Sequence, residues 1–300
     1  MMNPMRPKLQ IFQSFHKPYP RAVSCPWITP IRVGRFAADP AQTDSPAQTD
    51  APVQTEGAAL TAGALQKAGV LQSAGDFGQS LSDASGDSIT ALNPHYCELT
   101  AQYWVWKNLG VPGLPDFVGF YHYRRYLNFL FDSTWQGEFA FSVPIAEGML
   151  AYLSHEAQYE RLLQLLTLAD VVIPARFVSE QSVEAKYVHH HPAHTWIAFE
   201  QAIRRHHPSI APYLPLFALS NRQTVYNMFV MPWAIFDAYC HDLFAVIDDA
   251  FAQCARGYGN YNDRYPGFLA ERFLGLWLHA KGLKVIEVPM LMLTDEAGFS

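Results

Sequence analysis

Five consecutive residues, His122-Tyr123-Arg124-Arg125-Tyr126, concentrate more potential chemistry than any other part of this sequence. Two adjacent guanidinium groups can hold phosphate oxygens in a fork geometry that lysine cannot copy, and each charge-assisted hydrogen bond contributes about 1.5–3 kcal/mol. Neighbouring residues of an extended chain point to opposite faces, so the pattern favours one arginine on a ligand and the other on a carboxylate of the fold. The alternative is that both arginines have only structural partners. We expect Arg124 and Arg125 to bind a phosphate-bearing ligand.

A second polar segment, Gly86-Asp87-Ser88-Ile89, precedes Asn93 and the start of a predicted helix. Free backbone N–H groups at a helix start bind anions, and an aspartate can hydrogen-bond the hydroxyl groups of a ribose or another sugar. Asp87 and Asn93 are therefore candidate ligand-binding residues. The alternative is that Asp87 closes a turn and Asn93 caps the helix.

Glu271 is a candidate for acid–base chemistry because it stands beside Arg272 in an otherwise apolar helical pattern. A partly buried carboxyl group has a raised pKa and can act as a general base toward a hydroxyl group. A structural ion pair between Glu271 and Arg272 is the alternative. Glu98 is a second candidate for the base, and His122 is a further catalytic candidate.

The run His189-His190-His191, together with His194, has a spacing by which a helix can present two metal ligands on one face. No Asp, Glu or Cys beside it completes a recognisable ligand set, and Pro192 interrupts the run. The sequence also lacks any Asp-x-Asp triplet, the acidic motif with which many enzymes hold a metal–diphosphate group. We therefore name no metal-binding residues and no cofactor, and expect arginine to neutralise a bound diphosphate. Dependence on a divalent metal stays open.

The composition indicates a protein with a substantial core. Half of the 300 residues are hydrophobic and 14% are aromatic, which is enough for one large domain or two small ones. The formal net charge of −6 argues against a surface that follows nucleic-acid phosphates, because such a surface needs an excess of Lys and Arg. Four cysteines without a CxxC pair predict reduced thiols, and we find no apolar stretch typical of a signal peptide or membrane span. We therefore expect a cytoplasmic protein that does not bind nucleic acid.

Between residues 37 and 83 the composition changes to Ala, Gln, Thr, Pro, Asp and Gly, with the near-repeat PAQTD. So little apolar surface cannot offset the entropy of ordering the chain, so we expect a disordered or loosely helical insertion. It separates the first strands of the domain, residues 1–36, from the remainder, residues 84–300.

Hydrophobic periodicity predicts alternating strands and helices. The predicted strands are 8–15, 26–34, 117–121, 170–174, 225–231 and 284–288. The predicted helices are 93–110, 157–167, 193–206, 233–255 and 267–281. In the first helix, Asn93 suits the N-cap and Pro94 the first helical position. The alternation predicts a single-domain α/β fold with a mostly parallel sheet flanked by helices, and it puts His122 at a strand end, where such sheets bind ligands.

Several segments carry a resemblance to a known family when they are taken in order. They are His16-Lys17-Pro18-Tyr19, Gly86-Asp87-Ser88-Ile89, Asn93, Tyr96-Cys97-Glu98-Leu99-Thr100, Trp104 to Asn108, His122 to Tyr126, Tyr226-Asn227-Met228-Phe229 and Gly267 to Arg272. In this combination the chain resembles the bacterial domain-of-unknown-function 4422 family. That family is associated with capsular and exopolysaccharide gene clusters and is regarded as glycosyltransferase-like.

The resemblance implies a nucleotide-sugar-dependent glycosyltransferase, of hexosyltransferase type, that extends a capsular, exopolysaccharide or lipopolysaccharide glycan. It implies a GT-A-like (Rossmann-like) sheet whose first strand end, at His16 and Lys17, faces the nucleotide. We expect the donor to contact these two residues and Asp87, Asn93, Arg124 and Arg125. We expect the acceptor sugar to contact Tyr123, Tyr126, Asn227, Met228 and His194.

The partners implied are a nucleotide sugar and a glycan or lipid-linked acceptor, which would bring the protein to the inner face of the cytoplasmic membrane. Two alternatives stay open. One is a non-catalytic carbohydrate-binding or assembly protein whose Trp and Tyr side chains stack on sugar rings. The other is a metal hydrolase built on His189 to His194.

Overall fold

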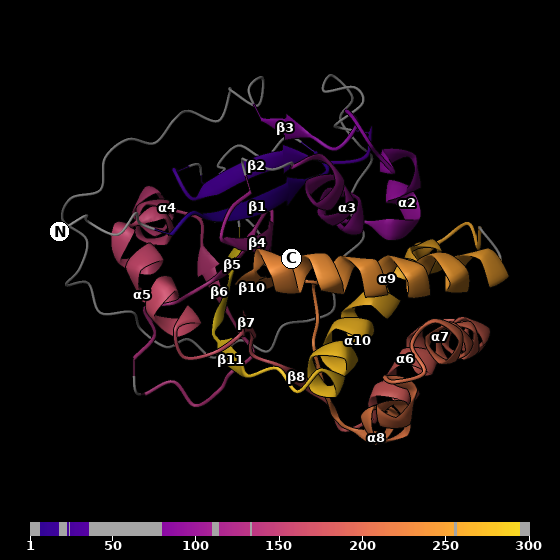
Figure 1. The fold of residues 1–300 in the computed structure, drawn as a ribbon. Coiled ribbons are helices and arrows are strands. Elements are labelled where there is room, and N and C mark those ends of the chain that lie inside the picture. The colour runs from indigo at the N-terminus through magenta and orange to yellow at the C-terminus, as the bar shows by residue number, and fades with distance from the viewer. Residues whose placement is uncertain are drawn as a thin grey trace.

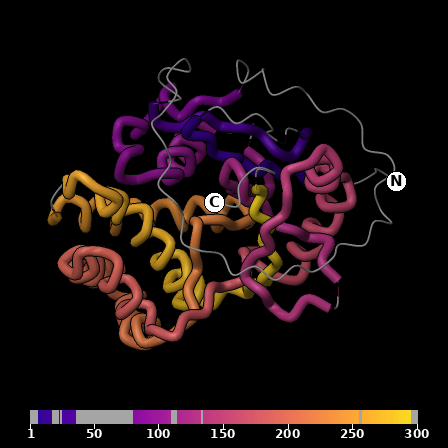
Figure 2. The backbone as a smooth tube through the Cα atoms, turned by 180° about the vertical axis from the view of Figure 1, so that it is seen from behind, coloured from indigo at the N-terminus to yellow at the C-terminus, as the bar shows by residue number. Residues whose placement is uncertain are grey.

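The computed structural model describes residues 7–17, 23, 25–35, 80–109, 114–132, 134–254 and 257–294. A central sheet runs through the molecule and helices cover both of its faces, with α4 and α5 on one side and α3, α9 and α10 on the other (Figure 1). The view from behind shows the same two layers of helices on opposite sides of the sheet (Figure 2). Among the described residues, no helix is both long and apolar enough to cross a lipid bilayer.

The main run of the sheet has the strand order β11-β7-β10-β4-β1-β2-β3. These strands are β11 (Val285–Val288), β7 (Val171–Pro174), β10 (Phe229–Pro232), β4 (Phe117–His122), β1 (Leu9–Phe15), β2 (Ile28–Arg32) and β3 (Leu81–Ser82). Neighbours are parallel except at β10, which is antiparallel to both β4 and β7. The mostly parallel α/β architecture expected from the sequence is therefore confirmed.

A second group of strands extends the sheet beside β4. These strands are β5 (Arg125–Leu127), β6 (Ala140–Pro144) and β12 (Met290–Thr294). Strand β12 pairs with β5 in antiparallel and with β6 in parallel register, and β5 turns back from the end of β4. A separate small ribbon joins β8 (Phe177–Val178) to β9 (Arg222–Gln223).

The helices follow the strands in an alternating order. The α-helices are α2 (Asn93–Tyr96), α3 (Leu99–Asn108), α4 (Glu147–Ser154), α5 (Glu156–Leu166), α6 (Val183–His190), α7 (Ala193–His206), α8 (Leu214–Leu219), α9 (Trp233–Gln253) and α10 (Tyr265–Ala280). Short 3-10 turns are η3 (Thr90–Leu92), η4 (Ala211–Tyr213) and η5 (Tyr261–Arg264). Helix α7 packs along α9, and α10 crosses behind it (Figure 1).

Two hydrophobic cores lie on the two faces of the sheet, as strand β7 illustrates. Val171 and Ile173 belong to the core formed with α3, α7, α9 and α10, whereas Val172 belongs to the core formed with α4 and α5. This alternation follows from the period of two in a β-strand, and it explains why the buried strands of the sequence read as continuous apolar runs.

The predicted helix over residues 93–110 is wrong in one respect, because it is two helices. Cys97 has a φ of +53°, which interrupts the helical backbone between α2 and α3. Asn93 is also not an N-cap: it is the first residue of α2, and its side-chain Nδ2 donates to the Cys97 carbonyl (2.7 Å) and to the Thr100 hydroxyl (3.1 Å). The Asn93 side chain therefore stabilises the backbone at the point where α2 ends and α3 begins.

The predicted strand over residues 225–231 begins later than expected, since β10 starts at Phe229. Tyr226 and Asn227 instead adopt left-handed backbone conformations, with φ of +67° and +48°. Neither residue is glycine, so the apolar run gives no local signal for this turn.

The predicted insertion over residues 37–83 lies outside the described residues as far as residue 79. Its last residues belong to the sheet, because Leu81–Ser82 form β3 beside β2, and the Asp83 side chain is fully buried. The predicted exit of the first helix at Gly110 also lies outside the described residues.

Candidate active site

A polar pocket opens beside the carboxyl end of β4. The segments that form it are the end of β4 with the turn into β5, the break between α2 and α3, the turn before β10, and η5 with the first half of α10. Its lining residues are Cys97, Glu98, His122, Arg125, Tyr226, Tyr261, Arg264, Gly267, Phe268 and Glu271. Its volume is about 60 Å³, well below the roughly 300–1,000 Å³ of pockets that enclose a whole ligand. It therefore has room for a small chemical group but not for a whole ligand.

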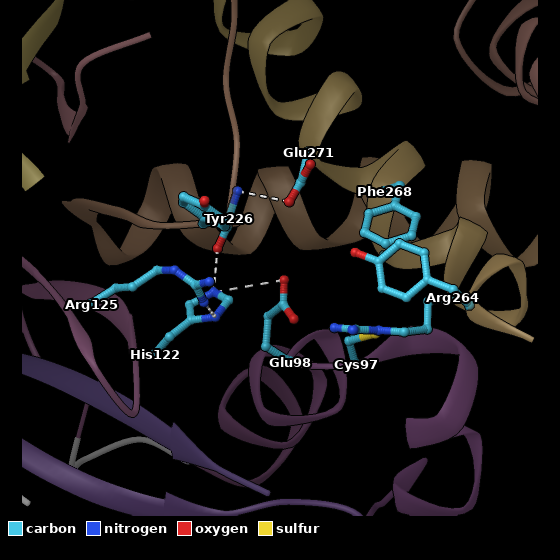
Figure 3. A pocket seen from close by; sticks show the side chains of 10 residues that line it. Cys97, Glu98, His122, Arg125, Tyr226, Arg264, Phe268 and Glu271 are labelled. Carbon is cyan, nitrogen blue, oxygen red and sulfur yellow. Dashed lines mark hydrogen bonds and ion pairs between the residues drawn. The ribbon is translucent and has the colours of Figure 1, made fainter. Parts of the chain in front are cut away.

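The left-handed turn before β10 holds the pocket together. The Tyr226 N–H donates to Glu271 Oε1 (2.8 Å), and the Tyr226 carbonyl accepts from His122 Nε2 (2.5 Å). Asn227 Nδ2 donates to Glu98 Oε1 (2.7 Å). Figure 3 shows Glu271 and Glu98 reaching the cavity from opposite sides, with Tyr226 and His122 between them.

Further hydrogen bonds, to α3 and α10, fix the turn formed by Tyr226 and Asn227. The Asn227 carbonyl accepts from Gln102 Nε2 on α3 (3.0 Å), and Asn227 Nδ2 also reaches the Gly267 carbonyl on α10 (3.2 Å). Two adjacent non-glycine residues in left-handed conformations persist only where their surroundings over-determine them, and such strain clusters at functional sites. The turn thereby ties α3, β4 and α10 into one rigid site.

Glu271 is 8% exposed and lies on α10 against Arg272, whose Nη1 is 2.5 Å from Glu271 Oε2. Burial removes water from the carboxylate and raises the pKa of Glu271 to about 6, although the Arg272 guanidinium opposes this change. The Glu98 carboxylate across the cavity raises the pKa of Glu271 further. A carboxyl group that titrates near 6 is a stronger base than an ordinary glutamate.

His122 has both ring nitrogens engaged. Its Nε2 carries the proton, because the Tyr226 carbonyl can only accept, and its Nδ1 faces Arg125 Nη1 at 3.4 Å. Burial lowers the pKa of His122, so the imidazole is neutral near pH 7. With Nδ1 directed at a guanidinium group, His122 is better placed to orient Tyr226 than to take up a proton.

Two arginines enter the pocket from opposite ends (Figure 3). The guanidinium of Arg125 lies 4.1 Å from the centre of the Tyr226 ring, and its residue is 5% exposed. Arg264 Nε lies 3.0 Å from Cys97 Sγ. Burial raises the pKa of the Cys97 thiol to about 11, so the sulfur stays protonated at neutral pH and is not a nucleophile.

Next to the pocket, the ends of β1 and β4 carry a basic rim, formed by His16, Lys17 and Arg124 around the ring of Tyr123. The His16 ring lies 5.0 Å from the Tyr123 ring, Lys17 Nζ 6.0 Å from it, and the Arg124 guanidinium carbon 5.5 Å from it. Ser14 of β1 is the register partner of His122 of β4, so the two strands end side by side. The fold thus brings together three predicted donor-binding residues, His16, Lys17 and Arg124, and one predicted acceptor-binding residue, Tyr123.

Two other predicted donor residues do not line the pocket. Asp87 accepts from the Tyr103 hydroxyl (3.0 Å), and its backbone pairs with the Asn108 side chain at the far end of α3. That end is about 15 Å from the helix start at the pocket, given a rise of about 1.5 Å per residue. Asn93 is occupied by its bonds within the α2–α3 break. Both side chains therefore have structural partners, as the alternative interpretation of the sequence allowed.

Three residues expected to contact the acceptor sugar are not on the pocket surface. Tyr126 and Met228 are fully buried in the core on the α4–α5 face, so their side chains are not on the surface as the sequence interpretation expected. Tyr126 lies within β5, whose three residues are all buried, and Met228 comes directly before β10. His194 is exposed and its Nε2 pairs with the Tyr258 hydroxyl (2.6 Å). Tyr123 belongs to the basic rim, and Asn227 holds Glu98 from within.

The histidine cluster is arranged for packing. His191 stacks on the Phe268 ring at 4.4 Å and faces Asn262 Oδ1 at 3.1 Å, while the His189 and His190 rings meet edge to face. Within the described part of the chain, no group of three or more His, Cys, Asp or Glu side chains is placed to hold a metal ion.

The sequence interpretation missed Tyr226, Tyr261 and Arg264. Tyr261 and Arg264 come just before Pro266, which marks the start of α10, so a helix start followed by Glu271 on the next turns is the signal that could have found them. No local signal identifies Tyr226, because its position depends on a left-handed turn that the sequence pattern does not reveal.

The fold and the site together define an α/β protein with a mostly parallel sheet flanked by helices and a charged pocket at the carboxyl end of a central strand. The chain belongs to the family described as "Domain of unknown function (DUF4422)", whose model matches residues 64–282, and this confirms the resemblance found in the sequence. Among solved structures, it is similar to the apo structure of WbbM, a bifunctional glycosyltransferase, with a TM-score of 0.74 and 24% sequence identity. The match covers 96% of this chain and 46% of that one, so this chain spans less than half of that protein. Among curated proteins, none matches the chain.

Proposed function

We propose that this protein is a glycosyltransferase that moves a sugar from a nucleotide-sugar donor to a hydroxyl group of a glycan acceptor. The observation that carries the proposal is the pocket in which Glu271, with its pKa raised to about 6, faces Glu98 beside Arg125 at the end of β4. A base and a guanidinium group around one small cavity suit the transfer of a group away from a phosphate. The similarity to a bifunctional glycosyltransferase supports the same choice.

The donor diphosphate is assigned to the basic rim and Arg125. Arg124, Lys17 and His16 surround Tyr123 at the end of β1 and β4, and Arg125 continues this positive surface into the cavity. Negative charge develops on the diphosphate as it leaves, and guanidinium groups fixed in place stabilise that charge without reorganising. Arginine thereby takes the part that a metal ion plays in enzymes with an Asp-x-Asp motif.

The transfer step requires a base for the acceptor hydroxyl. In the proposed reaction, the acceptor oxygen bonds to the anomeric carbon and gives its proton to the Glu271 carboxylate. The bond from the anomeric carbon to the diphosphate oxygen breaks, and its electron pair leaves with the diphosphate. Glu98, which is held by Asn227 on the other side of the cavity, is the second candidate for the base.

Donor binding by purified protein tests this proposal. Thermal stabilisation is measured with a panel of nucleotide sugars for the wild type, for the Arg124→Ala, Arg125→Ala double variant, and for Arg125→Lys, which keeps the charge and loses the fork. Arg204→Ala, at an exposed arginine of α7, is the matched control. Loss of one charge-assisted bond, about 1.5–3 kcal/mol, corresponds to roughly 10- to 100-fold weaker binding in the double variant. Stabilisation by no donor, or equal stabilisation of the double variant, would contradict the proposal.

The finer assignments form part of the same proposal. A growing capsular, exopolysaccharide or lipopolysaccharide glycan is the acceptor class that the family resemblance suggests. Transfer products formed from such acceptors with wild-type protein, and not with Glu271→Gln or Glu98→Gln, would identify both the acceptor class and the base. Product formation by Glu271→Gln together with its loss in Glu98→Gln would reassign the base to Glu98.

A further inference from the structure

One wall of the pocket is aromatic, and Figure 3 shows its Phe268 ring across the cavity from Arg125. It is formed by Tyr261 of η5 and Phe268 of α10, whose ring centres are 5.0 Å apart. Tyr261 is 39% exposed although it lines the pocket, so part of its ring faces solvent at the mouth of the cavity. Aromatic rings that line a polar pocket provide a flat apolar surface next to hydrogen-bonding groups.

This wall is held rigidly from behind. The His191 ring stacks on Phe268 at 4.4 Å with an interplanar angle of 21°, and burial lowers the pKa of His191 to about 4, so the stacked ring is uncharged. The guanidinium of Arg264 lies 5.2 Å from the Tyr261 ring and 5.7 Å from the Phe268 ring. Arg264 is itself anchored to Cys97 (3.0 Å). A surface fixed in this way loses little conformational entropy when a ligand binds.

The segment that carries Tyr261 also carries amide side chains. Asn260 is exposed and accepts from the Asn262 N–H (2.8 Å), and Asn262 Oδ1 faces His191. An aromatic face beside amide groups matches the two kinds of surface on a pyranose ring, which are a flat patch of C–H groups and a border of hydroxyl groups. The carboxylates of Glu98 and Glu271 in the adjoining cavity accept hydroxyl donors and repel phosphates.

From these contacts we infer that Tyr261 and Phe268 form the binding platform for a neutral pyranose ring of the acceptor, with one ring hydroxyl directed toward Glu271. That the bound sugar is the acceptor rests on the proposed function, whereas sugar binding at the platform does not. Arg125, at the end of β4, and Phe268, on α10, line different sides of the cavity (Figure 3), so a diphosphate at Arg125 leaves the platform to an uncharged sugar. The chemical class recognised is therefore a terminal neutral hexose.

Saturation-transfer NMR with simple glycosides tests the platform without a reaction. The probes are methyl β-glucopyranoside, methyl β-galactopyranoside and methyl α-mannopyranoside, applied to the full chain. The variants are Tyr261→Ala and Tyr261→Phe, and the control is Tyr213→Ala, because Tyr213 of η4 is equally exposed at 40% and lies outside the pocket. We expect at least one glycoside to bind the wild type, Tyr261→Phe and Tyr213→Ala. Tyr261→Ala should bind it about tenfold more weakly.

Two results would overturn the inference: binding of none of the three glycosides to the wild type, or equal affinity of Tyr261→Ala and the wild type. Melting temperatures of all variants verify that each is folded, and Tyr261→Phe keeps the test valid if the alanine variant unfolds. The same samples are titrated with uridine and guanosine diphosphates, whose affinity should be unchanged in Tyr261→Ala. A diphosphate that loses affinity in Tyr261→Ala would make the platform a nucleobase site and refute a sugar platform. Failure of both diphosphates to bind the wild type would count against the proposed function while leaving the glycoside result to decide the platform.

Discussion

The ionisation of Glu271 makes a measurable contribution to stability, and its sign is opposite to that of most carboxylates. Burial raises the pKa of Glu271 in the folded protein from its ordinary value of 4.5 to about 6. The folded state therefore binds a proton between these values where the unfolded state has released it. Below pH 4.5 both states hold the proton and Glu271 has no effect; above pH 6 both have lost it, and the full cost of the buried charge is present.

The size of this cost follows from the interval between the two pKa values. At about 1.36 kcal/mol per pH unit, the difference between 4.5 and about 6 corresponds to about 2 kcal/mol. The free energy of unfolding should therefore fall by about 2 kcal/mol, through this group alone, as the pH rises from 4.5 to 7. Other titrating groups add their own pH dependence, so the contribution has to be isolated by a matched variant.

Urea denaturation followed by tryptophan fluorescence at pH 4.5, 5.5, 6.5 and 7.5 isolates it by comparing the wild type with Glu271→Gln. The substitution leaves Arg272 without its counter-charge and shifts the overall stability, but that offset is independent of pH because arginine does not titrate in this range. The difference between the two curves should change by about 2 kcal/mol, with the wild type losing ground as the pH rises. Glu147→Gln, which removes an exposed carboxylate of α4, is the control. Parallel curves for the wild type and Glu271→Gln would refute the assignment of a raised pKa to this residue.

Two further predictions concern the scaffold of the site. Gly119→Ala should destabilise the protein by about 1–3 kcal/mol in thermal or urea unfolding, because the new Cβ would lie 2.8 Å from Val230 Cγ2 on β10. The control is Gly148→Ala, which should be neutral or stabilising because the space around Gly148 is open. Equal effects of the two substitutions would contradict the β4–β10 packing. Asn227→Ala should cost about 2 kcal/mol and reduce transfer activity, because it removes the hydrogen bond that holds Glu98; unchanged stability would show that the left-handed turn does not depend on this bond.

Much of the fold follows from local patterns in the sequence. Strand β1, helix α7 and helix α9 begin within a residue of the positions that apolar periodicity predicts, because their burial is continuous or regularly spaced. The antiparallel strand β10 and the added strand β12 were not recognisable as such. Their direction and position depend on which strands they pair with, and the apolar runs alone do not encode a partner.

The site was predictable only in part, because it is assembled from segments distant in the sequence. Arg125 and Glu271 could be found from the sequence, because a charged side chain within an apolar pattern indicates either an ion pair or a functional site. Glu98 was named as a second candidate for the base, whereas Arg264 lies in η5, a short 3-10 turn that apolar periodicity does not predict. Asp87, in contrast, hydrogen-bonds Tyr103 and Asn108, as the structural alternative for this residue predicted.

The central claim is that the carboxyl end of β4, with its arginines and two glutamates, is the place where a nucleotide sugar reacts. A crystal structure of the protein soaked with a nucleoside diphosphate tests this most directly. We predict that the phosphate oxygens lie within hydrogen-bonding distance of Arg125 or Arg124, on the side of the cavity away from the carboxylates of Glu98 and Glu271. A diphosphate bound on another face of the sheet, with both arginines retaining only protein contacts, would contradict the account.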